Sequence, residues 1–177
     1  MKRMMLVGAL LLTGVILSGC TINAENETTK DNILKFQTTK AMDDAGMTVE
    51  NTENLKVLAD IIEENPQVGE DNSLSIQYSG KYGNTNGVKQ VTFFVINKTD
   101  LKVKNISFYF TMQAGEKYIF DNILIELPEE TLGVLQPYSA MPFTITVGNG
   151  EYPLLAQIND GTLEIEVSTT DFLCEYD

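Results

Sequence analysis

Hydrophobic residues recur at every second position in six segments between residues 73 and 168. Neighbouring side chains of a β-strand point to opposite faces, so this period predicts strands with one buried face and one exposed face. Such strands cover their apolar faces by forming two packed sheets. The residues on the predicted buried faces are Leu74, Ile76 and Tyr78; Val91, Phe93 and Val95; Ile106, Phe108, Phe110 and Met112; Ile123, Ile125 and Leu127; Phe143, Ile145 and Val147; and Leu163, Ile165 and Val167.

The segment 91–96 differs from the other five, because Phe94 and Ile96 occupy the alternate positions as well. A strand that is apolar on both faces is typical of the centre of a sheet whose two sides are covered. We also expect Phe108 and Phe110, in the middle of a strongly alternating segment, to be buried.

Clusters of Gly, Asn and Asp separate the predicted strands. These residues tolerate positive φ or hydrogen-bond their own backbone, which turns require. We expect Asn97 and Thr99 to bond one such turn. Six to eight strands joined in this way predict a mostly β fold, an antiparallel immunoglobulin-like β-sandwich. The turn segments are 80–87, 97–100, 114–115, 148–150 and 159–161.

One segment before the strands has a helical period. Leu55, Leu58, Ala59 and Ile62 follow the spacing i, i+3, i+4 and i+7, which predicts a short amphipathic helix over residues 52–65. Asn51 or Thr52 would cap its start, and Pro66 follows its end. A strand is the alternative, because Val57 and the pair at 61–62 also suit a sheet.

Residues 21–40 are polar and rich in Thr, Asn, Glu and Lys, which is typical of a flexible tether. We therefore expect residues 20–50 to form a tether and residues 51–177 to form the domain. A short ordered turn around Ile33, Leu34 and Phe36 is the alternative within this stretch.

The first twenty residues carry a separate pattern. Lys2 and Arg3 precede an apolar run over residues 4–17, and residues 17–20 read Leu-Ser-Gly-Cys. The run is shorter than the roughly 20 apolar residues of a transmembrane helix. The basic start, the short apolar run and the small residues before Cys20 together resemble the lipobox leader of bacterial lipoproteins.

This resemblance implies that residues 1–19 are a signal peptide and that Cys20 becomes the lipid-carrying first residue of the mature protein. The lipid, a diacylglycerol in that family, would hold the protein on the extracytoplasmic face of the cell membrane. An uncleaved single-span anchor is the alternative. Residues 12–19 also resemble the short apolar peptides that some Gram-positive bacteria release from lipoprotein leaders as mating signals.

The chain is acidic, with 25 Asp and Glu against 12 Lys and Arg and a net charge of −13. Removal of Lys2 and Arg3 with the leader would leave ten basic residues and a net charge of −15. This balance argues against nucleic acid and anionic lipid as electrostatic partners. The chain has no His, which excludes Ser-His-Asp and Cys-His catalysis and imidazole zinc sites.

Cys174 is the second cysteine, and a lipid on Cys20 leaves it without an internal disulfide partner. Its acidic neighbours disfavour the thiolate, so we expect a passive apolar side chain. No carboxylate arrangement predicts a catalytic pair or a calcium loop, and the Glu164–Glu166 face is expected to be solvated. We therefore predict no catalytic residue, no metal ligand and no cofactor. The same holds for the other acidic positions, Asp43 and Asp44, Glu129 and Glu130, and Asp160, and for the turn segments 84–87 and 149–151, which lack a complete calcium-loop pattern.

Two stretches resemble small bacterial immunoglobulin-like domains of the FxLYD and SLAP types. They are Val-Thr-Phe-Phe-Val-Ile-Asn-Lys-Thr-Asp at 91–100, leading into 103–108, and Leu-Gln-Pro-Tyr-Ser-Ala-Met-Pro-Phe-Thr at 135–144. The resemblance covers roughly residues 73–147 and implies a non-catalytic envelope domain. Pro137 and Pro142 predict an irregular edge before the strand at Phe143. A binding role for an exposed Tyr138 is a further hypothesis.

These patterns together predict a lipid-anchored, extracytoplasmic, non-enzymatic binding or structural module of the cell envelope. Its partners would be the membrane, through Cys20, and another envelope protein or a wall component, with no role in binding nucleic acid. The alternatives are a small-ligand or cation-binding accessory lipoprotein of a transporter or sensor, and, last, an enzyme.

Overall fold

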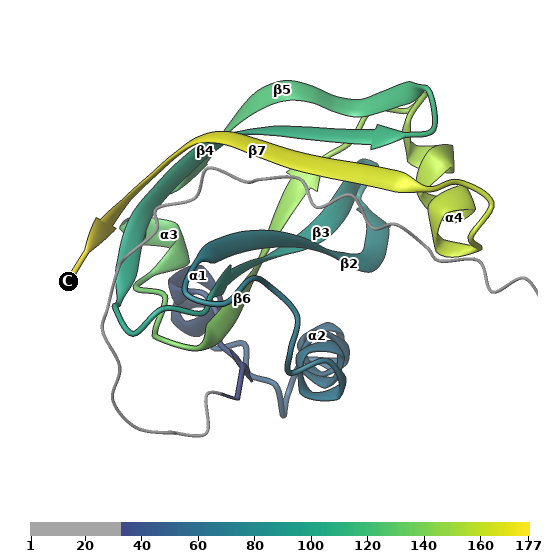
Figure 1. Ribbon diagram of the computed structural model, residues 1–177. Helices are drawn as coiled ribbons and strands as arrows, with labels where there is room; N and C mark the ends of the chain where they lie inside the picture. Colours follow the sequence, from purple (N-terminus) through teal and green to yellow (C-terminus); the bar gives the residue numbers. More distant parts are fainter. Residues whose placement is uncertain (1–32) are drawn as a thin grey trace, which may run out of the picture.

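The computed structural model describes residues 33–177 (Figure 1). Within this range the chain forms seven strands and four helices, in mixed order. The helices are α1 (Lys40–Asp44), α2 (Glu53–Glu64), α3 (Glu129–Leu132) and α4 (Tyr152–Asn159). The strands are β1 (Lys35–Phe36), β2 (Leu74–Thr85), β3 (Val88–Asn97), β4 (Val103–Ala114), β5 (Lys117–Leu127), β6 (Ser139–Thr146) and β7 (Ile165–Tyr176).

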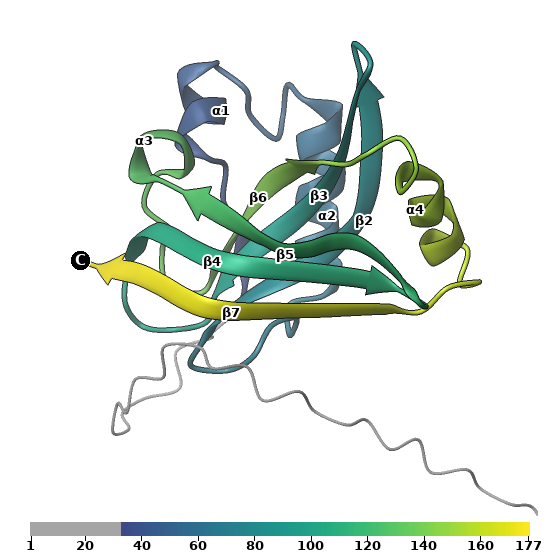
Figure 2. The ribbon, with the colours of Figure 1, turned by 90° about the horizontal axis from the view of Figure 1, so that it is seen from above.

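The strands form two sheets, so the predicted mostly β sandwich is confirmed. Sheet A has the order β1-β6-β3-β2 and sheet B the order β5-β4-β7 (Figures 1 and 2). All pairings are antiparallel except that of β1 with β6. The neighbour relations of β2, β3 and β6 match strands A, B and E of the immunoglobulin fold, and those of β5, β4 and β7 match C′, C and F. The immunoglobulin-like assignment itself stays a prediction.

The main core lies between the two sheets and is rich in phenylalanine. Phe93 of β3 lies at its centre, with its ring centroid 5.0 Å from that of Phe110 and 5.7 Å from that of Phe143. Phe108 and Phe110 are fully buried, as the alternation predicts. Aromatic pairs at these distances add stability beyond the area that they bury, so they hold the two sheets in contact.

A smaller second core lies on the outer face of sheet A, where α2 packs. Leu55, Leu58 and Ile62 of the helix contact Phe94 and Ile96 of β3. The predicted helix is therefore confirmed. The helix also explains why β3 is apolar on both faces: one face points into the sandwich, and the other lies beneath α2.

The predicted tether is wrong for its C-terminal part. Leu34 is buried in the second core, and Lys35 and Phe36 pair with Ser139 and Ala140 of β6. Helix α1 follows, with Thr39 capping its start by accepting from the Met42 N–H. The folded unit therefore begins before residue 51, because the few apolar side chains of this polar stretch find a sheet edge and a helix to pack against.

The hairpin between β2 and β3 is tighter than predicted. Strand β2 runs to Thr85, and only Asn86 and Gly87 form the turn, both with positive φ. Two such residues are typical of a type I′ turn, whose twist matches that of paired strands. The other residues of the predicted turn segment, 80–85, belong to β2. The strand is irregular between Tyr78 and Tyr82 and pairs regularly with β3 again from Tyr82.

The connection from β6 to β7 contains a helix that the pattern of turns did not predict. Helix α4 begins with Pro153 in its first turn and buries Leu154 and Leu155 in the main core. Within residues 33–177, no helix is long and apolar enough to cross a membrane.

Candidate functional site

A groove with a volume of about 660 Å³ lies against the outer face of sheet A. Helices α1 and α2 and the loop after α1 form one wall, and α3 with the end of β5 forms the far end. Strands β2, β3 and β6 supply the floor. Figure 2 shows α1 and the tip of the β2–β3 hairpin on the same side of the molecule, with α2 between them in that view.

The floor of the groove is polar because α2 covers only one half of this sheet face. Phe94 and Ile96 lie beneath the helix, whereas the next outward positions towards the hairpin are Thr92 and Gln90. Thr92 lies directly opposite Thr144 of β6 in the strand register. Hydroxyl and amide groups therefore replace apolar side chains where the helical cover ends.

The wall of the groove is mainly apolar. Met42 of α1 and Met47 of the following loop are half-buried against the second core, and Leu55 of α2 lies beside them. Asn54 and Thr39 add an amide and a hydroxyl on this side. Methionine side chains are flexible and adapt to irregular surfaces, so this wall suits contact with a partner of varied shape.

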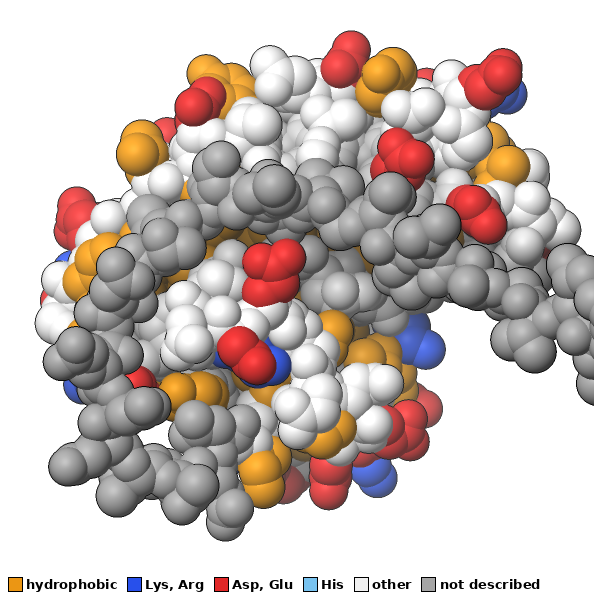
Figure 3. All heavy atoms as spheres, in the orientation of Figure 1, with side chains coloured by type: hydrophobic (Ala, Val, Ile, Leu, Met, Phe, Trp, Pro, Cys, Tyr) orange, Lys and Arg blue, Asp and Glu red, His pale blue; other side chains and the backbone are white. Residues whose placement is uncertain are grey.

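The groove is nearly free of charge, although the protein is strongly acidic. Lys81 is the one charged side chain among its lining residues in the range 33–177, and these include no Asp, Glu or Cys. Acidic side chains are spread over the face shown in Figure 3, with few basic ones. The groove can therefore donate and accept hydrogen bonds and bury apolar surface, and its lining residues supply no carboxylate or thiol.

A smaller hollow of about 500 Å³ lies nearby, where α1 and α3 also supply lining residues. It is acidic, with Asp43, Glu129 and Glu130 among its lining residues. Glu129 contacts Lys104 at 3.5 Å, and Asp43 accepts a hydrogen bond from the Thr38 hydroxyl. Two of the three carboxylates therefore already have partners.

The predicted lipid site, Cys20, lies outside the described residues. Cys174 is half-buried in β7, where its side chain packs against the main core. Glu164 and Glu166 are exposed, as expected for a solvated face. Among residues 33–177, no three His, Cys, Asp or Glu side chains come together in a way that would hold a metal ion.

Asp160 serves a turn. Its carboxylate accepts hydrogen bonds from the N–H and the hydroxyl of Thr162, and these bonds lower the pKa of Asp160. The carboxylate therefore helps to end α4 and start the approach to β7.

Tyr138 is not the exposed aromatic that the sequence hypothesis required. It is half-buried, with a φ of 50°, immediately before β6. Burial raises the pKa of its hydroxyl, and the neighbouring Asp100 carboxylate raises it further. Strand β6 begins at Ser139 and includes Pro142, so the predicted irregular edge extends only to Tyr138.

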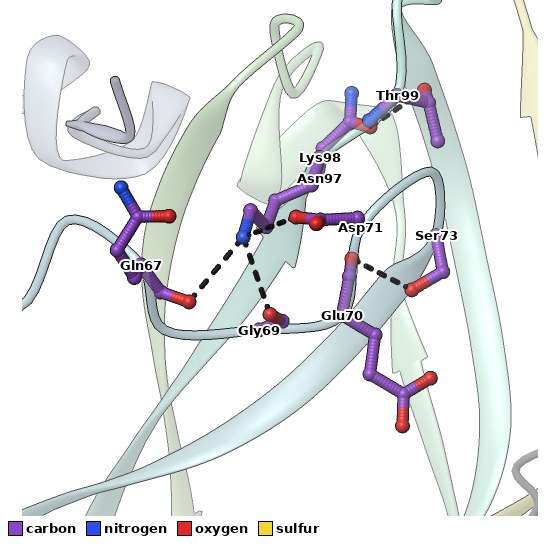
Figure 4. Close-up of polar contacts among 8 residues, drawn as sticks. All are labelled: Gln67, Gly69, Glu70, Asp71, Ser73, Asn97, Lys98 and Thr99. Carbon is purple, nitrogen blue, oxygen red and sulfur yellow. Dashed lines mark hydrogen bonds and ion pairs between the residues drawn. The ribbon is translucent and has the colours of Figure 1, made fainter. Parts of the chain in front are cut away.

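The segment Asn97-Lys98-Thr99 holds the turn between the two sheets, as predicted for Asn97 and Thr99 (Figure 4). The Asn97 side chain donates to the Leu101 and Gln136 carbonyls and accepts from the Thr99 N–H and hydroxyl. All of these contacts are internal, so this segment has a structural role.

Lys98 was not singled out by the sequence patterns, yet it is almost fully buried. Its ammonium group donates to the carbonyls of Gln67 and Gly69 and lies 2.7 Å from an Asp71 carboxylate oxygen (Figure 4). The lysine therefore fastens the loop between α2 and β2 to the start of the β3–β4 connection.

A second exposed surface crosses the outer face of sheet B. Tyr109 of β4 lies directly opposite Leu124 of β5. Leu173 of β7 lies opposite Ser107, which is two residues before Tyr109 in β4. Leu124 and Leu173 are 51% and 65% exposed. This face differs from that of sheet A, which α2 covers in part.

Comparison with known proteins gives no family. No family model matches the chain, and no curated protein matches it. A crystal structure of a protein from Archaeoglobus fulgidus is similar over 59% of this chain and 91% of its own, with 13% sequence identity and a TM-score of 0.29. A likeness at this level carries no argument about function.

Proposed function

We propose that this protein is a lipid-anchored, non-enzymatic binding module of the cell envelope, and that the groove on sheet A is its binding site for another envelope protein or a wall component. The observation that carries the proposal is the near absence of charged side chains in the groove on sheet A of an acidic protein. A surface of this kind favours an uncharged polar partner, because burying a charged group without a partner for it is costly.

The membrane location rests on the leader sequence. The basic start, the short apolar run and Cys20 support a lipid anchor on the extracytoplasmic face. The immunoglobulin-like strand order supports the same conclusion in a general way, since domains of this kind are common on cell surfaces.

Binding of a small ligand is the second candidate, because the groove volume of about 660 Å³ is within the range of ligand pockets. A cation is disfavoured there, since hard cations prefer carboxylate oxygens and the lining residues supply none. Catalysis is disfavoured for the related reason that a general acid or base would have to come from Lys81 or Tyr82.

A pull-down from detergent-solubilised membranes tests the proposal. We expect full-length protein to retain a partner that Thr92→Arg loses, because a long cationic side chain on the groove floor fills the space and adds an unpaired charge. Thr170→Arg is the matched control, since Thr170 is an exposed strand threonine on sheet B. Circular dichroism spectra and melting temperatures would establish that both variants are folded.

The outcomes separate the alternatives. Loss of the partner in the Thr170 variant alone would move the binding site to sheet B. Recovery of a bound metabolite, with no macromolecule, would favour the small-ligand function.

A further inference from the structure

The edge of β6 that borders the groove is unpaired beyond its first residues. Strand β1 pairs with β6 only at Ser139 and Ala140, although β6 continues to Thr146. Sheet A has no other strand on this side in the described part of the chain. Pro142, Phe143 and Thr144 of this open stretch line the groove.

Pro142 explains why the pairing with β1 ends. The N–H of Gln37 donates to the Ala140 carbonyl, which is the last bond from β1 to β6. The next bond of a parallel ladder would run from the N–H of residue 142 to Gln37, and proline has no N–H. The chain instead leaves the edge, and the Gln37 side chain bonds the Val134 carbonyl and the Gln136 N–H.

The direction of the main-chain groups beyond Pro142 follows from the same bonds. The carbonyls of Tyr138 and Ala140 point to β1. Main-chain groups alternate along a strand, so those of Thr144 and Thr146 point to the same open side. Thr144 therefore presents both a donor and an acceptor at the groove, where its side chain and that of Thr92 form the floor.

We propose that the groove binds an extended, uncharged segment of a partner protein, which adds to sheet A as a strand beside Pro142–Thr146. This inference rests on the proposed function and names its partner class. Main-chain bonds to Thr144 would give affinity, and alternate side chains of the segment would contact the Thr and Gln floor and the Met wall. The strand edge, which ordinarily has to be protected against other chains, would here be the recognition element.

A glycan fits this groove less well than a peptide. Sugar rings commonly stack on exposed aromatic faces, and the aromatic lining residues are Tyr82 and Phe143. The Tyr82 ring already packs edge-on against Tyr152, with 5.3 Å between centroids, and Phe143 is buried. A second copy of this chain is disfavoured by the net charge of −13, which repels like molecules.

Binding of defined peptide libraries to the full-length protein in detergent tests the proposal. The first library contains decapeptides of Gly, Ala, Ser, Thr, Val and Asn, and two matched libraries contain Asp and Glu or Lys and Arg in addition. We expect the protein to select uncharged peptides. Thr144→Pro should lower the affinity for the selected peptide at least tenfold, because it removes the main-chain N–H of residue 144 at the strand edge. N-methylation of the peptide at successive residues should reduce binding at alternate positions only.

The N-methyl series leaves the protein unchanged, so it decides the question even if the proline variant does not fold. Uniform tolerance of N-methylation would overturn strand addition. The protein could bind no peptide from any library while Thr92→Arg still loses the membrane partner in the pull-down. This result would overturn the peptide proposal and leave the proposed function standing. Retention of that partner by Thr92→Arg would overturn both.

Discussion

The rings of Phe108 in β4 and Phe172 in β7 lie parallel, with 5.1 Å between centroids and 5° between planes. This stack depends on Asp171, whose φ of 51° marks an irregularity in β7. Ile165 and Val167 point to the core on one side of it, and Phe172 and Cys174 do so on the other. One extra residue thus changes which alternate positions face inwards, as β-bulges do.

Phe172→Ala tests this stack. We expect a loss of about 3 kcal/mol in the free energy of unfolding, because a buried aromatic ring is removed and its cavity remains. Leu173→Ala is the matched control, since Leu173 is the next residue and is exposed. Urea unfolding would measure both. A larger effect of Leu173→Ala than of Phe172→Ala would mean that β7 has the opposite register.

Phe110→Ala tests the main core. Phe110 is fully buried and contacts Phe93, Phe108 and Phe120. The expected loss is about 3–5 kcal/mol. A melting temperature equal to that of the unchanged protein would show that β4 is wrongly placed.

The hydrogen bonds of the Lys98 ammonium group to two loop carbonyls should stabilise the fold more than its ion pair with Asp71 does. Lys98→Met keeps the apolar stem but leaves the Gln67 and Gly69 carbonyls without this donor, so we expect a loss of about 1–3 kcal/mol in unfolding free energy. Asp71→Asn should change the stability by less than about 1 kcal/mol, because that carboxylate is exposed. A larger effect at Asp71 would assign the stabilisation to the ion pair instead.

Tyr78 links stability to alkaline pH. Burial, and secondly repulsion from Tyr82, raise the pKa of Tyr78 to about 12, above the value of about 10 for an exposed tyrosine. The folded state therefore retains a proton that the unfolded state loses, and stability should fall between pH 10 and pH 12. Tyr78→Phe should make this fall smaller, although it also removes the hydrogen bond to Asn159. Urea unfolding across this range, with tyrosinate absorbance, would detect it; an unchanged pH dependence would refute the assignment.

Cys20→Ala tests the anchor. We expect the variant to leave the membrane fraction for the medium or to accumulate as unprocessed precursor, because no thiol remains to take the lipid. Cys174→Ala is the control and should fractionate like the unchanged protein. Normal membrane retention of the Cys20 variant would refute the lipobox interpretation.

Several features of the fold follow from local pattern. The period of two located part of each strand from β2 to β7, and the period of 3.6 located α2, since each has one apolar face that has to be covered. The predicted segments ended at Tyr78 and Ser168, whereas β2 continues to Thr85 and β7 to Tyr176. Asn97 and Thr99 bond a turn because short polar side chains reach their own backbone. These outcomes depend on neighbours in the chain, so the sequence by itself determined them.

Other features depended on contacts between distant segments. Two residues of β1 are too few to signal a strand, and they order because β6 offers an edge and α2 covers Leu34. The groove arises where α2 ends over sheet A, and it combines residues from four strands, three helices and the loop after α1. The sequence shows that Pro142 cannot donate a hydrogen bond, but only the tertiary structure places that missing donor on an open edge beside Thr144, because strand order is set by long-range packing.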